Sequence, residues 1–251
     1  MRNLTETSRR LEREPARSGV RPLSTRMETP YETSELLNII GHELRSPITP
    51  LKMRLQQARR RLQRERQRER DIDDLSKALY QVERMQQRLA LYLDAAFLMQ
   101  GLLTLALRPT DLSEATRRLS GIYALGEDNR SIRLEETGQP LFGIWDGPRV
   151  DTALRELLGN ALKYTTGDIT IRLKRHGQFA RVEVEDAGPA MPASLRKHIF
   201  EPYITGCQNN HGLGLGLHVA REIVHLHGGE MGLRANVAGG SLFWFTLPLS
   251  E

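Results

Sequence analysis

Apolar residues recur at seven-residue intervals in two stretches of the first hundred residues. In the first stretch they are Leu37, Leu44, Leu51 and Ala58, with a second row at Ile48, Leu55 and Leu62. In the second stretch they are Leu75, Val82, Leu89 and Ala96, with a second row at Ile72, Leu79 and Leu93. Two such rows on one face predict two long amphipathic helices. The charged run RRRLQRERQRERD separates them, so residues 31–100 are expected to form an antiparallel helical hairpin.

A single hairpin of this kind cannot bury its apolar stripe. Left in water, the stripe would be a contiguous patch larger than soluble monomers usually expose. We therefore expect two copies of the chain to pair through residues 31–100 as a dimeric four-helix bundle.

The pattern changes after Gly101, where helical and strand-like segments alternate. A helix is expected from Asp111, with Glu114 in capping-box position, and another over 149–165. Short strands are expected near 131–136 and 140–145, a β-hairpin over 168–186, a helix over 215–227, and two further strands after it. Residues 101–251 are therefore predicted to be an α/β sandwich, and the whole chain is α+β.

Composition narrows the class of protein. The first thirty residues mix charged and small polar residues with Pro, so we expect residues 1–30 to be a disordered tail. The net charge is +5, but the arginines concentrate in that tail and in one run without aromatic residues, which argues against nucleic-acid binding. Cys207 is the single cysteine, and neither a membrane span nor a signal-peptide core is evident. The sequence thus favours a cytoplasmic protein without a direct membrane span.

Three segments of the second half carry residues suited to binding a nucleotide. GLGLGL, residues 212–217, leads into a helix, and its bare backbone N–H groups suit a phosphate, although such loops are often only turns. Glu156, Asn160 and Lys163 share one helix face and suit Mg²⁺ and its phosphates; the alternative is an exposed polar face. Asp186 ends a strand two residues before a glycine and could accept a hydrogen bond from an adenine amino group; the alternative is a plain turn.

A further motif lies in the first predicted helix. GHELRSPITP places Pro47 and Pro50 inside that helix, one turn after the pair His42–Glu43. Proline removes a helix hydrogen bond and costs about 3 kcal/mol, so it weakens the helix beside the histidine.

In its order of motifs the chain resembles the two-component sensor histidine kinases. HELRSP, the Asn160 helix, the Asp186–Gly188 turn, IFEPY and GLGLGL follow one another as they do in that family, and the likeness covers about residues 31–250. It implies a dimerisation and phosphoacceptor hairpin over 31–100. It also implies an ATP-binding domain over 101–251, in which a mixed sheet lies on three helices, as in gyrase and heat-shock ATPases.

The resemblance also assigns roles to residues. It makes His42 the phosphoacceptor, with Glu43 beside it to orient or deprotonate the imidazole. Asn160, assisted by Glu156, would bind Mg²⁺, and Lys163 would contact phosphate. The remaining ATP-binding positions would be Tyr164, Asp186, Gly188, Phe200, Gly212, Leu213, Gly214, Leu215 and Gly216. The implied activity is autophosphorylation of His42 with Mg²⁺-ATP, then transfer to an aspartate of a response-regulator receiver domain.

Some positions depart from the family pattern and leave an alternative open. Ala190 stands where a second glycine is usual, and the loop over 206–211 is short and lacks Lys and Arg. Ser46 occupies the position that supports phosphatase activity in relatives. The alternative is a non-catalytic relative that dimerises with or sequesters another kinase or regulator. With no recognisable sensor in the sequence, the stimulus is expected to come through the tail, a separate sensor protein or a region outside this chain.

Overall fold

The computed structural model describes residues 50–51, 53–58, 60, 68–124, 131–136, 138–165, 167–189, 191–205, 213–236 and 239–250, all within one compact unit, Tyr31–Glu251. The helices are α2 (Arg68–Met99), α3 (Leu112–Ala124), α4 (Gly147–Tyr164), α5 (Ala193–His198) and α6 (Gly216–Leu226). The strands are β1 (Arg108–Asp111), β2 (Ile132–Glu136), β3 (Phe142–Trp145), β4 (Ile169–His176), β5 (Phe179–Asp186), β6 (Met231–Ala235) and β7 (Ser241–Pro248).

Five strands form a mixed sheet in the order β2-β4-β5-β7-β6. β2 runs parallel to β4, and every other neighbouring pair is antiparallel. The predicted hairpin is β4–β5, in which Ile169 lies opposite Asp186. This register places Asp186 at the end of the sheet where β4 begins. The mixed sheet covered by helices confirms the α+β fold expected from the sequence.

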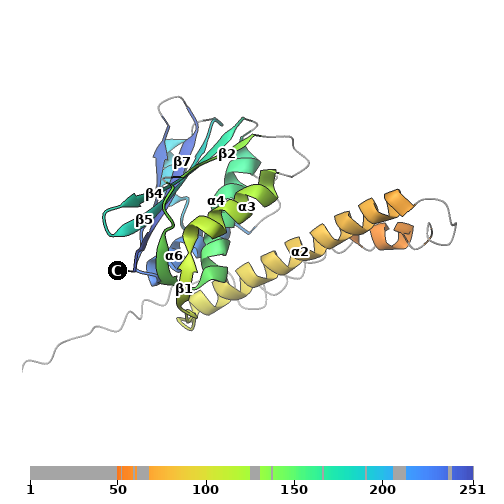
Figure 1. The fold of residues 1–251 in the computed structure, drawn as a ribbon, viewed down its shortest axis with the longest axis horizontal. Coiled ribbons are helices and arrows are strands. Elements are labelled where there is room, and N and C mark those ends of the chain that lie inside the picture. The colour runs from red at the N-terminus through yellow and green to blue at the C-terminus, as the bar shows by residue number, and fades with distance from the viewer. Residues whose placement is uncertain are drawn as a thin grey trace, which may run out of the picture. The chain divides into compact units, whose positions relative to one another are not determined.

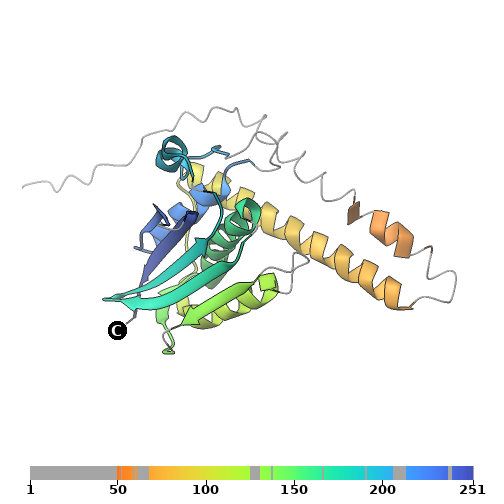
Figure 2. The same ribbon diagram turned by 90° about the horizontal axis from the view of Figure 1, so that it is seen from above.

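Helices α3, α4 and α6 cover one face of this sheet (Figures 1 and 2). The strands alternate, so that Ile169, Ile171 and Leu173 of β4 point into the core beneath the helices. On the opposite face Lys174 and Arg181 both pair with Glu183. The apolar face and the charged face therefore settle which side of the sheet the helices occupy.

Two elements were not expected from the sequence. β1 pairs with β3 in a separate two-stranded antiparallel sheet, and α5 is a helix of 6 residues. The predicted helix at Asp111 begins one residue later, at Leu112, and the Asp111 carboxylate accepts a hydrogen bond of 2.8 Å from the Ser113 backbone N–H. Asp111 is the last residue of β1, so one residue both ends the strand and caps the helix that follows.

Helix α2 corresponds to the second helix of the predicted hairpin. Of the first helix only a few residues between 50 and 60 are described, so the hairpin and its dimer stay predictions. On α2 the predicted seam residues Leu79 and Leu93 are exposed by 63% and 49% in the single chain. Leu91 and Tyr92, by contrast, are buried in the same core as the ATP-binding domain. Helix α2 thus carries two apolar faces, of which one packs within the chain.

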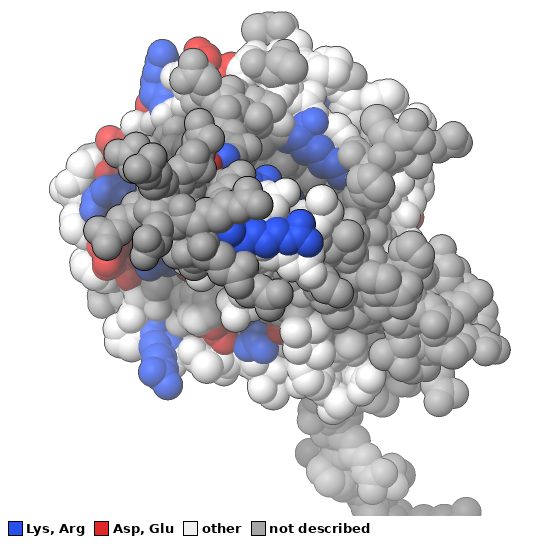
Figure 3. All heavy atoms as spheres, turned by 90° about the vertical axis from the view of Figure 1, so that its right-hand side faces the viewer, with Lys and Arg blue, Asp and Glu red and all other residues white. Residues whose placement is uncertain are grey.

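No helix among the described residues is long and apolar enough to cross a membrane. On the face drawn in Figure 3, the described Lys and Arg side chains are scattered among uncharged atoms rather than gathered into one continuous patch.

Candidate nucleotide-binding site

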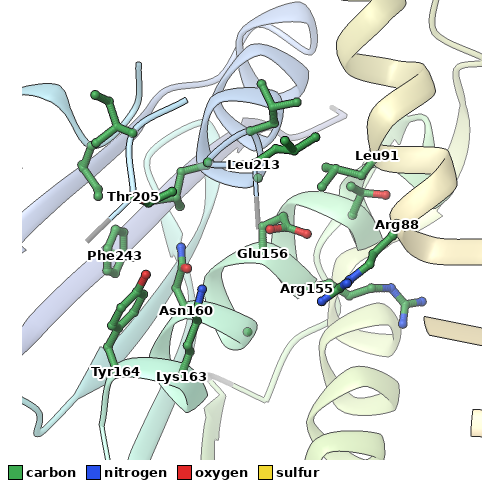
Figure 4. A pocket seen from close by; sticks show the side chains of 18 of the residues that line it. Arg88, Leu91, Arg155, Glu156, Asn160, Lys163, Tyr164, Thr205, Leu213 and Phe243 are labelled. Carbon is green, nitrogen blue, oxygen red and sulfur yellow. The ribbon is translucent and has the colours of Figure 1, made fainter. Parts of the chain in front are cut away.

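A cavity of about 750 Å³ lies between α2, α4 and the start of α6. Figure 4 shows its side chains converging from these elements. The residues predicted from the sequence that line it are Glu156, Asn160, Lys163, Tyr164, Asp186, Leu213, Gly214, Leu215 and Gly216. The structure therefore brings three sequence motifs, separated by up to 60 positions in the chain, to one cavity.

Helix α4 supplies one wall. It begins after Asp146, whose carboxylate accepts a hydrogen bond from the Arg149 backbone N–H, and Pro148 lies in its first turn, where no donor is needed. Its buried face includes Leu157 and Leu158 and fixes the helix on the sheet. The opposite face then presents Glu156, Asn160 and Lys163 to the cavity, one helical turn apart (Figure 4).

Asp186 lies at one end of the cavity and is only 5% exposed. Its Oδ1 accepts hydrogen bonds from the backbone N–H groups of Gly188, at 2.9 Å, and Ser241, at 3.4 Å. Burial raises the pKa of this carboxyl, and the two backbone hydrogen bonds act in the opposite direction. The side chain is thus held in one orientation by the chain around it.

Glycines make this close packing around Asp186 possible. A Cβ at Gly240, where φ is +86°, would lie 2.1 Å from the Asp186 carbonyl oxygen. A Cβ at Gly188 would lie 2.9 Å from the Tyr164 carbonyl oxygen. Gly188 itself does not line the cavity; it allows the end of α4 and the end of β5 to approach each other.

The glycine segment before α6 lies at the other end of the cavity. Gly214 adopts φ of +65° and its carbonyl accepts a 3.0 Å hydrogen bond from the Tyr203 backbone N–H. Gly216 is the first residue of α6, and a Cβ there would lie 1.9 Å from Oε2 of Glu156. The Glu156 carboxylate and the N-terminus of α6 are therefore immediate neighbours.

Among the acids that line the cavity, Glu156 has the most strongly shifted pKa. Burial raises its pKa to about 7, while the positive charges of Arg88 and Lys163 favour the ionised form and oppose this rise. Lys163 lies over the ring of Tyr164 at 5.2 Å. A carboxyl whose pKa lies near neutrality changes charge readily when a cation or an anion arrives beside it.

Phe200 does not line the cavity but supports a residue that does. Its ring packs edge-on against Phe243, with 6.5 Å between centroids, and Phe243 lines the cavity. The His218 ring nitrogen Nδ1 lies 3.2 Å from the Phe200 carbonyl oxygen and holds this segment to α6. Burial lowers the pKa of His218, so its neutral ring donates this bond.

The sequence did not predict several lining residues, among them Phe243 of β7 and Arg88 of α2. Phe243 belongs to an ordinary alternating strand, and Arg88 is one of many arginines on its helix, so neither had a distinguishing pattern. Among the described residues, no group of three His, Cys, Asp or Glu side chains could by itself hold a metal ion.

Some predicted residues lie outside the described part of the chain. These are the phosphoacceptor His42, its neighbour Glu43, the phosphatase candidate Ser46 and the first glycine of the glycine segment, Gly212. The same holds for Ala190 and for the loop over 206–211, which includes Cys207, so the expected effects of Ala190 and of this short loop on ATP binding stay predictions.

The C-terminal part of the chain matches a known family. Residues 145–251 match the family described as histidine kinase-, DNA gyrase B- and HSP90-like ATPase. The matched segment begins just before α4 and includes Glu156, Asn160, Asp186 and the glycine segment. This is the ATP-binding domain that the order of motifs implied.

Relatives extend the likeness over more of the chain. This chain is 28% identical to the alginate biosynthesis sensor protein KinB of Pseudomonas aeruginosa, over 86% of this chain and 37% of the relative. It is 30% identical to the sensor protein RstB of Escherichia coli over 86% of this chain and 48% of the relative. The chain thus spans less than half the length of these relatives.

A solved structure agrees with the assignment. The catalytic domain of the histidine kinase ThkA is 28% identical, covers 57% of this chain and 95% of its own, and superposes with a TM-score of 0.52. Residues 145–251 thus carry the histidine kinase-, DNA gyrase B- and HSP90-like ATPase domain, and over most of its length the chain is similar to sensor histidine kinases.

Proposed function

We propose that this protein is an ATP-dependent protein-histidine kinase that phosphorylates its own His42 and passes the phosphoryl group to an aspartate of a response-regulator receiver domain. The observation that supports this most is the convergence of Glu156, Asn160, Asp186 and the glycine segment on one cavity. In a chain of this family, a cavity with these residues suits ATP.

The two ends of the cavity differ in what they can bind. Asp186 and Tyr164 form one end, where an oriented carboxylate can accept a hydrogen bond from the adenine amino group. Glu156 and Gly216 form the other, where the positive end of α6 favours phosphate. Since Glu156 and Tyr164 are eight residues apart on α4, the two ends are separated by about 12 Å.

The same residues would suit a magnesium ion that accompanies the phosphates. Asn160 offers an amide oxygen and Glu156 a carboxylate, and both are ligand types that Mg²⁺ accepts alongside water and phosphate oxygens. When bound, Mg²⁺ neutralises phosphate charge during phosphoryl transfer. Two protein oxygens are too few for a closed metal site, which agrees with an ion that arrives with its nucleotide.

In the proposed reaction a ring nitrogen of His42 attacks the γ-phosphorus of ATP. A P–N bond forms while the P–O bond to ADP breaks, and Glu43 orients the ring or takes up its proton. The weakened helix at Pro47 would let the two domains meet. The receiver aspartate then takes the phosphoryl group from His42. Ser46 would orient a water molecule if the protein also dephosphorylates the regulator.

The assembly that we propose is a homodimer through residues 31–100, with a separate sensor protein as a possible input. The exposed leucines of α2, including Leu75, Leu79 and Leu93, support this interface because each is more than 40% exposed in the single chain. Light scattering should give twice the chain mass, and Leu79→Glu should shift the mass toward that of the monomer.

Incubation with radiolabelled ATP and Mg²⁺ tests the activity. The wild-type protein should acquire an acid-labile, alkali-stable label, and His42→Ala should lose it while still binding ATP. His225→Ala is the matched control, because His225 is exposed on α6 and does not line the cavity. Label that persists in His42→Ala at the wild-type level would refute His42 as the acceptor.

A further inference from the structure

The phosphate end of the cavity is not built by the ATP-binding domain alone. Leu91 and Tyr92 of α2 are buried in the core of that domain, and Asp94 of α2 lies 3.3 Å from the guanidinium of Arg149 on α4. The last turns of α2 therefore pack on this domain, in contact with α6 and with an ion pair to α4. Arg88 lies one turn before Leu91 and Tyr92, on the same face of the helix.

Arg88 reaches the cavity from this position. It lines the cavity together with Leu91, and Figure 4 shows its side chain extending from α2 toward α4, on the side where Glu156 and Arg155 lie. Glu156 contacts the N-terminus of α6 through the close approach of Gly216. Arg88 is thus near the end of the cavity opposite Asp186.

A positive charge is needed at the Glu156 end of the cavity if a triphosphate is to bind there. A triphosphate placed beside Glu156 would be repelled by an ionised carboxylate, and repulsion between like charges is strong where water is partly excluded. Arg88 is the first of the positive charges that counter the raised pKa of Glu156, ahead of Lys163. An arginine also presents a planar fork of donors that matches phosphate oxygens.

Two other arginines near Arg88 have contacts that direct them elsewhere. The Arg84 guanidinium lies over the ring of Tyr80 at 5.8 Å, and Arg155 pairs with Asp151 at 3.7 Å. Both also line the cavity. Of the three arginines, Arg88 is the one whose positive charge favours the ionised form of Glu156.

We propose that Arg88 of α2 is a nucleotide-binding residue that contacts the phosphates of ATP from the helical part of the chain. This inference rests on the proposed function, because it takes ATP as the occupant of the cavity. It adds a phosphate contact to the residues that the sequence motifs supply.

The consequence is a link between nucleotide affinity and helix position. If ATP binds Arg88, then ATP binds most tightly when α2 lies against α4 as described, and bound ATP in turn stabilises that contact by the same free energy. Any movement of α2 that withdraws Arg88 weakens the hold on the phosphates and leaves the adenine contacts unchanged.

Calorimetric titration of full-length variants with ATP and with adenosine, both in Mg²⁺, tests the proposal. Arg88→Gln should weaken ATP binding about tenfold, equivalent to about 1.4 kcal/mol, and leave adenosine binding unchanged. Arg88→Lys should retain part of the ATP affinity because it keeps the charge. Lys77→Gln is the control: it removes a charge from an exposed part of α2 that does not line the cavity.

The outcomes separate this inference from the function on which it rests. Unchanged ATP affinity in Arg88→Gln, or an equal loss of ATP and adenosine affinity, would overturn the role of Arg88. A wild-type protein that binds adenosine but not ATP would overturn it as well. A wild-type protein that binds neither would instead refute the cavity as a nucleotide site. Thermal melts of each variant show whether a loss of affinity reflects misfolding.

Discussion

The two ends of the cavity are built in different ways. At the Asp186 end, the carboxylate is fixed by backbone N–H groups and enclosed by Gly188 and Gly240, all within the ATP-binding domain. At the Glu156 end, the carboxylate lies against the start of α6, and part of the wall belongs to α2. One end is preorganised by its own domain, while the other depends on packing between two parts of the chain.

This difference indicates a division of roles between the ends. If the base binds at the preorganised Asp186 end, as we propose, it binds there with little loss of conformational entropy. An end completed by α2 can change its affinity for phosphate when α2 moves. Changes at the first end should therefore affect every adenine ligand, and changes at the second should affect only the ligands that carry phosphates.

The largest effect is expected from Asp186→Asn. The amide offers one acceptor where the carboxylate has two, and Oδ1 already accepts two backbone hydrogen bonds. We expect ATP and adenosine affinity to fall together by about 100-fold, or about 2.7 kcal/mol. Calorimetry measures both, with the exposed Asp168→Asn as control. A loss of ATP affinity without a loss of adenosine affinity would contradict the placement of the adenine beside Asp186.

A smaller effect, visible in stability, is expected from Glu156→Gln. Burial raises the pKa of Glu156 to about 7, above its usual 4.5. Below pH 4.5 both the folded and unfolded states hold the proton, so the residue has no effect on stability there. Between pH 4.5 and pH 7 the unfolded state loses this proton while the folded state keeps it, so the stability of the wild type falls across this range and levels off above pH 7.

Urea unfolding at pH 5 and pH 8 measures this difference. From pH 5 to pH 8 the free energy of unfolding of Glu156→Gln should rise relative to that of the wild type by about 2 kcal/mol. Glu83→Gln, which alters an exposed carboxylate on α2, should show no such gain. An equal gain in both variants, or none in either, would contradict the burial of Glu156.

The smallest effect is expected from Asp94→Asn. It removes the partner of Arg149 that ties α2 to α4, a half-buried ion pair worth about 1 kcal/mol or less. Loosening α2 should weaken ATP binding by about two- to fivefold, within the range of that energy. Adenosine binding should not change. Asp73→Asn is the matched control, because Asp73 pairs with Lys77 on an exposed part of α2.

Sequence reasoning identified residues at both ends of the cavity but missed the contribution of α2. Asp186, Asn160 and the glycine segment could be predicted because each belongs to a short motif whose residue types suit one kind of ligand. Local patterns also predicted the strands of the β4–β5 hairpin and the helices α4 and α6, since alternation and helical periodicity extend over whole elements.

What could not be predicted depends on contacts distant in the sequence. Arg88 and Glu156 are separated by 68 positions, and nothing in the heptad pattern of α2 distinguishes the face that contains Leu91 and Tyr92 from the exposed face. Strand β1 was missed because RPTD has a proline and no alternation. Short α5 has no buried residues, so it has no apolar periodicity to detect.

Direct comparison of ATP and adenosine binding to the wild-type protein tests the account of a two-ended cavity. Titration in the presence of Mg²⁺ should show that both ligands bind and that ATP binds at least tenfold more tightly, since only ATP reaches Glu156, Gly216 and Arg88. Equal affinities would mean that the phosphate end contributes nothing. No binding of either ligand would mean that this cavity is not a nucleotide site.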